Sequence, residues 1–186
     1  MLFRSGAADQ GALSAAGERL GATICYEDAY ASEQRAVLRT ALTAIVRMAP
    51  DLSLCAAFAD AESAVDGLKK VVPDVVLMDA FLPGKSGIEC TRWVHAELPL
   101  TRVIMLSIEE DSRTVFHALE AGASGYLLKP TEPVRILDAI REVHLGGTPM
   151  AREVARSLAR VLRSRAEGGS SAASTAQSES MDPPAG

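Results

Sequence analysis

The sequence has few cysteines and no long apolar run, and both shortages restrict the class of protein. Its three cysteines, Cys25, Cys55 and Cys90, form no C-x-x-C pair and are odd in number. They therefore indicate neither a disulfide framework nor a zinc site. No apolar stretch approaches the length of a membrane span, and the N-terminus lacks the apolar core of a signal peptide. We expect a cytoplasmic protein that does not enter a membrane.

Positive charge is also in short supply. Lysine and arginine number 19 against 24 aspartates and glutamates, which gives a net charge of −5. This balance gives no reason to expect the whole protein to coat nucleic acid or an anionic membrane. The hydrophobic content of 48% and the charged content of 23% are ordinary for a globular protein, and 186 residues suit one domain with tails.

The two ends of the chain differ in composition from its middle. Residues 1–21 are rich in Gly, Ala and Ser without sustained periodicity, and residues 166–186 are of low complexity. Such segments bury too little apolar surface to fold alone, so we predict a disordered extension and a disordered tail. The sequence predicts a folded domain over residues 22–148 and a linker-type helix over residues 149–165.

The middle of the chain alternates between apolar runs and segments with helical periodicity. The helices have clear end signals: Asp60, Ser86 and Asp111 can cap three of them, and Gly122 can end one. The predicted strands cover 22–26, 52–58, 75–78, 103–106 and 126–128. The predicted helices include 32–48, 86–98 and 131–145.

Five strand-then-helix units with continuously apolar strands predict an α/β fold with a parallel sheet covered by helices on both faces. Because crossovers between parallel strands are right-handed, few topologies remain. The natural candidate is a flavodoxin-like, doubly wound sheet in the order 2-1-3-4-5, followed by a C-terminal helix.

Polar residues follow four of these strands, where ligands bind in open α/β sheets. They are Glu27 with Asp28, Asp79, Ser107 and Lys129. Three carboxylates in one crevice repel each other unless a cation neutralises them, and Mg²⁺ (or Mn²⁺) suits such oxygen ligands. The ammonium of Lys129 and the hydroxyl of Ser107 can then hold the oxygens of a phosphoryl group.

Two stretches carry a family resemblance. VVLMDAFLPGKSG surrounds Asp79, and AGASGYLLKP ends with Lys129 and Pro130. Together with the acid pair they resemble the receiver domains of response regulators, and the second stretch is similar to receivers of nitrate-response, helix-turn-helix regulators. The resemblance covers roughly residues 22–148.

The resemblance implies a role for each site residue. Asp79 would be the phosphoacceptor, and Glu27 and Asp28 would bind the metal with Asp79. By the same resemblance the backbone carbonyl of Phe81 would be a further metal ligand, Ser107 would supply the switch hydroxyl, and Lys129 would bind the phosphate. Tyr126 would be the aromatic residue that turns inward on activation, and the peptide bond before Pro130 would be cis. An ordinary core position is the alternative reading of Tyr126.

By the same resemblance the chain is a signalling module rather than an enzyme, with at most slow self-phosphorylation and self-dephosphorylation. Its partners would be a histidine kinase or a phosphotransfer protein, and the phosphorylated form is a candidate homodimer. Because no helix-turn-helix pattern follows the domain, we expect no direct DNA binding. A truncated DNA-binding regulator and a phosphorylation-independent binding module remain alternatives.

Two enzyme-like or cofactor-binding alternatives are disfavoured. A phosphatase of the haloacid-dehalogenase kind needs an acid two residues after the acceptor, where this chain has Phe81. A flavin-binding flavodoxin needs a phosphate cradle after its first strand, where the acids Glu27 and Asp28 would repel the flavin phosphate.

The helix predicted after Pro149 has two opposite faces. One carries the apolar residues Val154, Leu158, Val161 and Leu162, and the other carries Arg152, Arg156, Arg160 and Arg163. We expect this helix to pack back on the domain or to act as a linker. The more specific alternative is that the helix mediates dimerisation or contacts phosphate groups.

Overall fold

The computed structural model describes residues 20–25, 41–82, 85–109 and 111–174, with side chains in the last helix described up to Arg163. Five parallel strands form one sheet in the order β2-β1-β3-β4-β5. The strands are β1 (Leu20–Cys25), β2 (Leu52–Phe58), β3 (Val75–Asp79), β4 (Arg102–Ser107) and β5 (Gly125–Leu128). The predicted fold class and strand order are therefore confirmed.

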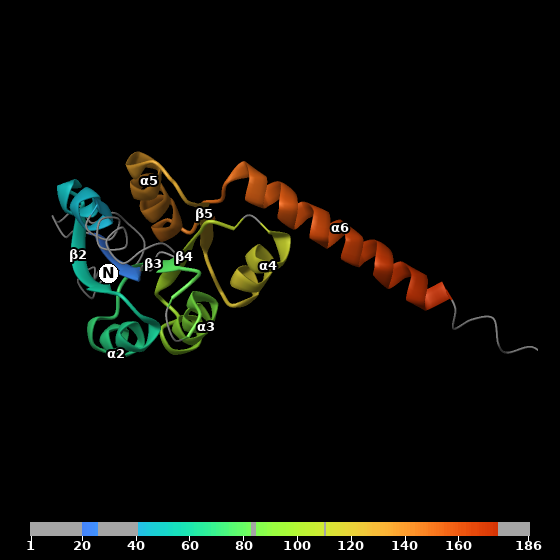
Figure 1. The fold of residues 1–186 in the computed structure, drawn as a ribbon, viewed down its shortest axis with the longest axis horizontal. Coiled ribbons are helices and arrows are strands. Elements are labelled where there is room, and N and C mark those ends of the chain that lie inside the picture. Colours follow the sequence, from blue (N-terminus) through green and yellow to red (C-terminus); the bar gives the residue numbers. More distant parts are fainter. Residues whose placement is uncertain (1–19, 26–40, 83–84, 110, 175–186) are drawn as a thin grey trace, which may run out of the picture.

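Helices cover both faces of this sheet (Figure 1). They are α2 (Ala61–Val71), α3 (Gly87–Glu97), α4 (Ser112–Glu120), α5 (Pro133–His144) and α6 (Arg152–Ser174), and residues 41–48 are also helical. The helical residues 41–48 pack with α5 on one face, whereas α2, α3 and α4 cover the other. The strands are mostly apolar because alternate residues face two separate cores.

The capping signals in the sequence produce the helix ends that they predict. Asp60 accepts a hydrogen bond from the Ser63 backbone N–H at 2.8 Å, and Asp111 accepts from the first turn of α4. Gly122 follows the C-terminal end of α4 with a φ of +99°, a conformation that side chains with a Cβ rarely adopt. These local bonds set where each helix begins and ends.

Two predicted boundaries need correction. The first strand begins at Leu20 rather than at residue 22, because Leu20 pairs with Leu52 of β2 and is itself buried. The C-terminal helix continues to Ser174, so residues 166–174 are helical rather than part of a disordered tail. No proline stands between Pro149 and Pro183 to break it, and the helix therefore extends past the residues that show amphipathic periodicity.

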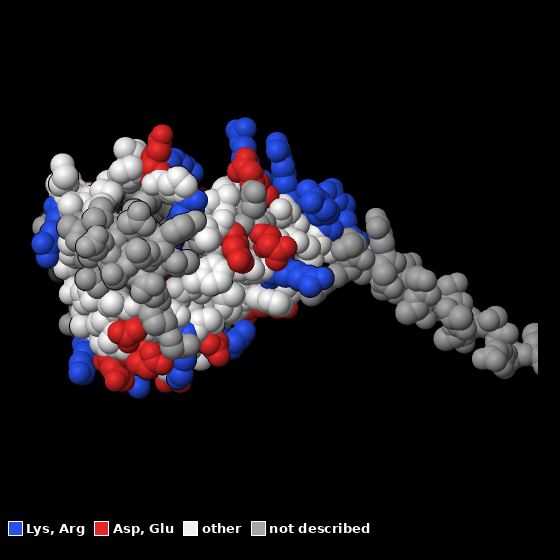
Figure 2. Space-filling view, in the orientation of Figure 1, with Lys and Arg blue, Asp and Glu red and all other residues white. Residues whose placement is uncertain are grey.

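The helix α6 extends away from the body of the domain (Figure 1). Its first turn packs against α4, and Val154 is fully buried there. In Figure 2, lysine and arginine side chains gather where α6 leaves the domain, whereas both signs of charge are mixed over the rest of the visible face. The apolar stripe thus meets the domain at its N-terminal end, and Arg152, Arg156, Arg160 and Arg163 are exposed.

Candidate functional site at the carboxyl edge of the sheet

Three of the predicted site residues meet at the carboxyl edge of three neighbouring strands. Asp79 is the last residue of β3, Ser107 is the last of β4, and Lys129 directly follows β5. The ladder continues to this edge: the Lys129 backbone N–H donates to the Ser107 carbonyl at 2.7 Å, and the Ala80 N–H donates to the Leu106 carbonyl at 2.9 Å. Strand register therefore brings together residues that are far apart in the sequence.

The carboxylate of Asp79 is held by two donors. The Nζ atom of Lys129 lies 2.6 Å from Oδ2, and the backbone N–H of Phe81 donates to Oδ1 at 3.1 Å. The side chain of Asp79 is only 1% exposed and that of Lys129 is 14% exposed. A carboxylate this buried needs a compensating charge, and the lysine ammonium supplies it.

The turn after Asp79 depends on a close approach of two backbone segments. The N–H of Gly87 donates to the Ala80 carbonyl at 3.1 Å, and a Cβ placed on Gly87 would lie 1.8 Å from the backbone oxygen of Asp79. Only glycine permits this contact, so Gly87 positions the turn after Asp79.

Ser86, in the turn between Asp79 and α3, caps α3. Its hydroxyl accepts from the Glu89 backbone N–H at 3.2 Å, and its own N–H donates to Glu89 Oε2 at 2.9 Å. The hydrogen bond from the Ser86 backbone lowers the pKa of Glu89. This reciprocal pair is a capping box, which gives the serine a structural role next to the site.

Glu109, which no sequence pattern singles out, connects the Ser107 hydroxyl to Tyr126. The backbone N–H of Glu109 donates to Ser107 Oγ at 3.0 Å, and the Glu109 carbonyl accepts from the Tyr126 hydroxyl at 2.8 Å. Its carboxylate accepts from Thr114 Oγ1 at 2.9 Å. Two of these three bonds use the backbone of Glu109, so no residue type could have revealed them.

Tyr126 points into the protein and is fully buried. It packs in the core cluster on the face covered by α2, α3 and α4, and its hydroxyl bonds the loop after β4. Tyr126 is therefore a core aromatic, and its movement on activation stays a prediction. Burial raises the pKa of Tyr126, a hydrogen bond with Ser107 opposes the shift, and the charges of Glu109 and Asp111 add to it.

The predicted acid pair, Glu27 and Asp28, lies outside the described residues. The register of the sheet nevertheless places the end of β1 beside the end of β3, because Cys25 pairs with Met78. Among the described residues no cluster of three His, Cys, Asp or Glu side chains could hold a metal. The oxygen donors that are described, the Asp79 carboxylate and the Phe81 carbonyl, are of the type that suits a hard cation such as Mg²⁺.

Two further predicted features are visible near Asp79. The peptide bond between Lys129 and Pro130 is cis. Phe81 is 42% exposed and offers no acid at the place where a haloacid-dehalogenase phosphatase needs one.

The parallel 2-1-3-4-5 sheet and the strand-end Asp, Ser and Lys define the receiver class of flavodoxin-like domains. The chain belongs to the response regulator receiver domain family, whose model matches residues 32–141. Its function is accordingly that of a receiver domain of two-component response regulators.

Individual relatives agree with this membership. The chain is 34% identical over 127 residues to the transcriptional regulatory protein DegU of Brevibacillus brevis, covering 68% of this chain and 54% of that protein. A LuxR-family response regulator from an Aurantimonas species has a structure that superposes with a TM-score of 0.64 at 29% identity, covering 75% of this chain and 95% of that one. The signal receiver domain of the response regulator NarL from Mycobacterium tuberculosis superposes with a TM-score of 0.61 at 25% identity, over 69% and 98% of the two chains.

The chain spans little more than half the length of curated relatives such as DegU of Brevibacillus brevis. None of the helices that the structure describes is both long and apolar enough to cross a bilayer.

Proposed function

We propose that this receiver accepts a phosphoryl group on Asp79 and that Lys129 and Ser107 bind the transferred group. The observation that carries the proposal is the pairing of the buried Asp79 carboxylate with the Lys129 ammonium at 2.6 Å. A buried carboxylate at the edge of a parallel sheet, with a cation beside it and a hydroxyl on the neighbouring strand, has the groups that phosphoryl transfer requires.

The transfer is a displacement at phosphorus. A carboxylate oxygen of Asp79 forms the new P–O bond, and the bond from phosphorus to the donor breaks with its electron pair leaving on the donor atom. The product is an acyl phosphate. Negative charge then rises at the site, and the Lys129 ammonium offsets part of it while the Ser107 hydroxyl can donate to a phosphoryl oxygen.

We also propose a Mg²⁺ (or Mn²⁺) site formed by Glu27, Asp28, Asp79 and the Phe81 carbonyl. The bound cation would neutralise charge on the phosphoryl oxygens. Support comes from the oxygen donors at Asp79 and Phe81 and from the register that ends β1 beside β3. The acids two and three positions after Cys25 would complete the set.

The donor in this proposal is a histidine kinase or a histidine phosphotransfer protein in the cytoplasm. Small donors such as acetyl phosphate would react slowly, and the chain would turn over no other substrate. The relatives carry names of transcriptional regulators and are longer than the match. Regulation of transcription by this chain would require DNA contacts that its receiver part does not provide.

The test is mass spectrometry of the intact protein after incubation with acetyl phosphate and Mg²⁺. The parent should gain the mass of one phosphoryl group, about 80 Da, and the gain should disappear when the metal is chelated. Asp79→Asn should show no gain. The matched control is Asp66→Asn on α2, whose side chain is 77% exposed.

Labelling that survives Asp79→Asn would refute the acceptor assignment. Absence of labelling in a folded parent, also with a purified histidine kinase as donor, would instead support a binding module that works without phosphorylation.

A further inference from the structure

One side of α6 carries a row of exposed positive charge. Arg152, Arg156, Arg160 and Arg163 stand three or four positions apart, and each is exposed. Because an α-helix turns by about 100° and rises by about 1.5 Å per residue, they fall within an arc of about 80° and extend over about 16 Å of the axis. The apolar residues of α6 lie on the opposite side, where Val154 is buried against the domain. We call these four residues the arginine row.

The charge of the arginine row is not neutralised by ion pairs. None of its four members forms an ion pair with another residue in the part of the chain that is described. The carboxylate of Asp111 is close by, but it accepts hydrogen bonds from the first turn of α4 and caps that helix. Residues 149–165 contain five arginines and one acid, whereas the whole chain has a net charge of −5. The row is therefore a local concentration of positive charge on an acidic protein.

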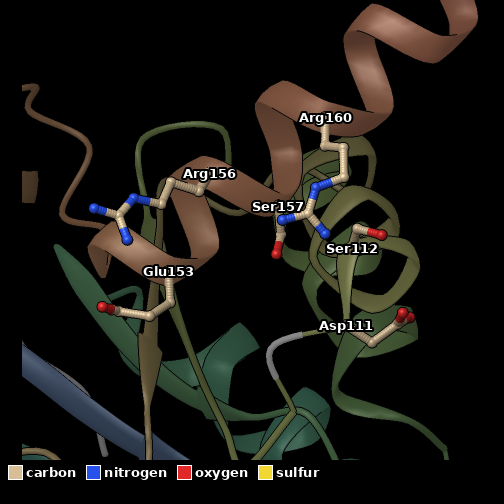
Figure 3. Close-up of a pocket in the computed structure, with 6 residues that line it drawn as sticks. All are labelled: Asp111, Ser112, Glu153, Arg156, Ser157 and Arg160. Carbon is tan, nitrogen blue, oxygen red and sulfur yellow. The ribbon is translucent and has the colours of Figure 1, made fainter.

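A pocket of about 570 Å³ opens beside the row, between α4 and α6. It is lined by Asp111, Ser112, Glu153, Arg156, Ser157 and Arg160. Figure 3 shows the Arg160 side chain directed toward Ser112, whereas Arg156 points away from it, so the two guanidinium groups do not converge on one point. A small anion would contact one of these groups at a time, but a partner with many anionic groups would contact several. The arrangement favours an extended polyanion over a compact ligand.

The direction of α6 leaves the row accessible to a long partner. The helix extends away from the body of the domain and is described to Ser174 (Figure 1). In Figure 2, the lysine and arginine side chains gathered where α6 leaves the domain form part of the visible surface. A stiff partner can thus lie along the row without colliding with the sheet and the helices that cover it.

The side chains of α6 argue against a membrane as this partner. A basic helix that binds a lipid surface inserts large apolar side chains beside its charged face. The apolar residues of α6 lie opposite the row instead, and Val154 is already buried in the domain. Among the described side chains of the helix, Leu162 is the large apolar one that is exposed. This is too little apolar surface to hold the helix in a bilayer interface.

The same helix favours a duplex over a single-stranded nucleic acid. A guanidinium group binds a phosphate with two parallel N–H donors and remains charged. A single strand is bound largely by stacking its bases on aromatic side chains, and the sequence of α6 contains no aromatic residue. A duplex needs no such platform, and it presents a stiff line of phosphates with one negative charge per about 1.7 Å of its axis.

We propose that the arginine row binds duplex DNA through its phosphates. Residues 152–163 contain no asparagine or glutamine that could read base edges, so the contact is independent of base sequence. This departs from the expectation, drawn from the missing helix-turn-helix pattern, that the chain does not bind DNA directly. The row lies outside residues 32–141, which match the receiver family, and binding there needs no phosphoryl group on Asp79. The inference therefore does not depend on the proposed function.

The test is fluorescence anisotropy of the full chain with labelled duplexes of two unrelated sequences. Four phosphate contacts predict that the affinity falls about 100-fold between about 50 mM and about 200 mM salt, because the duplex releases its condensed counterions on binding. The two sequences should bind with the same affinity within about twofold, since phosphate contacts carry no sequence information.

The row is removed by the combined substitutions Arg156→Gln, Arg160→Gln and Arg163→Gln. Glutamine has nearly the helix propensity of arginine, so α6 should persist, and circular dichroism checks that it does. With one arginine left, the affinity should fall only about threefold over the same salt range. At the lower salt concentration the variant should bind at least about tenfold more weakly than the parent.

The matched control removes the same charge from the body of the domain. Arg92→Gln, Arg102→Gln and Arg135→Gln combine three exposed positions outside α6. This variant should keep the steep salt dependence of the parent, because its arginine row is intact. If it loses the salt dependence as the α6 variant does, the binding reflects overall charge and the proposal is overturned.

Three further outcomes would also overturn the proposal. The parent might be shown not to bind either duplex at the lower salt concentration, or the folded α6 variant to bind as tightly as the parent. Tighter binding to vesicles that contain phosphatidylserine would assign the row to a membrane. Displacement of the duplex by polyglutamate at equal concentration of charge would assign it to an acidic protein.

Discussion

The Nζ atom of Lys129 lies 2.6 Å from Oδ2 of Asp79, although Asp79 ends β3 and Lys129 follows β5, two strands that are not adjacent. β4 separates β3 from β5, so the lysine side chain reaches across the end of β4, where Ser107 stands. This bridge over the middle strand gathers the three site residues into one volume. It also makes the stability of the domain depend on a charge pair to which we assign a role in phosphoryl transfer.

Removing Lys129 alone should therefore lower the free energy of unfolding more than removing both charges of the pair. We expect Lys129→Met to lower the free energy of unfolding by about 3 kcal/mol, because it leaves the Asp79 carboxylate buried without its cation. Asp79→Asn combined with Lys129→Met should lose less than the sum of the single variants, since no charge remains uncompensated. Urea unfolding of all four proteins gives the coupling energy. Additive losses would show that the pair contributes no net interaction.

Gly87 offers a test of the acceptor turn. Gly87→Ala should lower the free energy of unfolding by about 2 kcal/mol or more, because the new Cβ would meet the backbone oxygen of Asp79. The control is Gly146→Ala, where no atom lies within 4 Å and only the φ of +86° opposes the substitution, at a cost of about 1 kcal/mol. Thermal unfolding of the two variants shows which substitution lowers the stability more. A smaller loss at Gly87 than at Gly146 would contradict the close approach.

The buried phenol of Tyr126 predicts a loss of stability at high pH. Burial raises its pKa above the ordinary value of 10.0, so the folded protein binds the phenolic proton more tightly than the unfolded chain. The stabilisation is complete below about pH 10 and is lost as the pH rises through the higher value of the folded state. Urea unfolding at about pH 9 and about pH 11 should show a steeper decline for the parent than for Tyr126→Phe. Equal slopes would mean that the phenol ionises as easily in the fold as outside it.

The three thiols should differ in reactivity. Burial raises the pKa of Cys90 to about 12 and also raises that of Cys25, whereas Cys55 is only partly buried. Since the thiolate is the reactive form, an alkylating reagent at about pH 8 should modify Cys55 at least about tenfold faster than the others. Peptide mass spectrometry identifies the labelled position, and Cys55→Ser should leave the native protein nearly unlabelled. All three should react in denaturant. Rapid labelling of Cys90 in the native state would contradict its burial.

Much of the fold could be read from local signals. The predicted strand at Leu52–Phe58 has the bounds found in the structure, and Asp60, Ser86 and Asp111 cap the helices that they were expected to cap. These features depend on hydrogen bonds between residues a few positions apart, which residue type and spacing reveal directly. The site residues could be named for a similar reason, because each one follows an apolar run.

Other parts of the site have no local signature. Glu109 connects Ser107 with Tyr126 mainly through backbone atoms, which any residue would offer. The contact of Tyr126 with Pro149 and Met150 joins segments that lie more than twenty positions apart, and it depends on how the chain returns to the β5 edge. Glu27 and Asp28 remain predictions because they lie outside the described residues.

The sequence by itself determined the alternation of strands and helices, the strand order, the helix caps and the identity of Asp79, Ser107 and Lys129 as strand-end residues. Periodicity and capping are properties of short segments, and parallel crossovers restrict how those segments assemble. Only the tertiary structure decided that β1 begins at Leu20, that Tyr126 is fully buried, and that the first turn of α6 docks on α4. Each of these depends on packing between distant parts of the chain, where burial and register rather than residue type set the outcome.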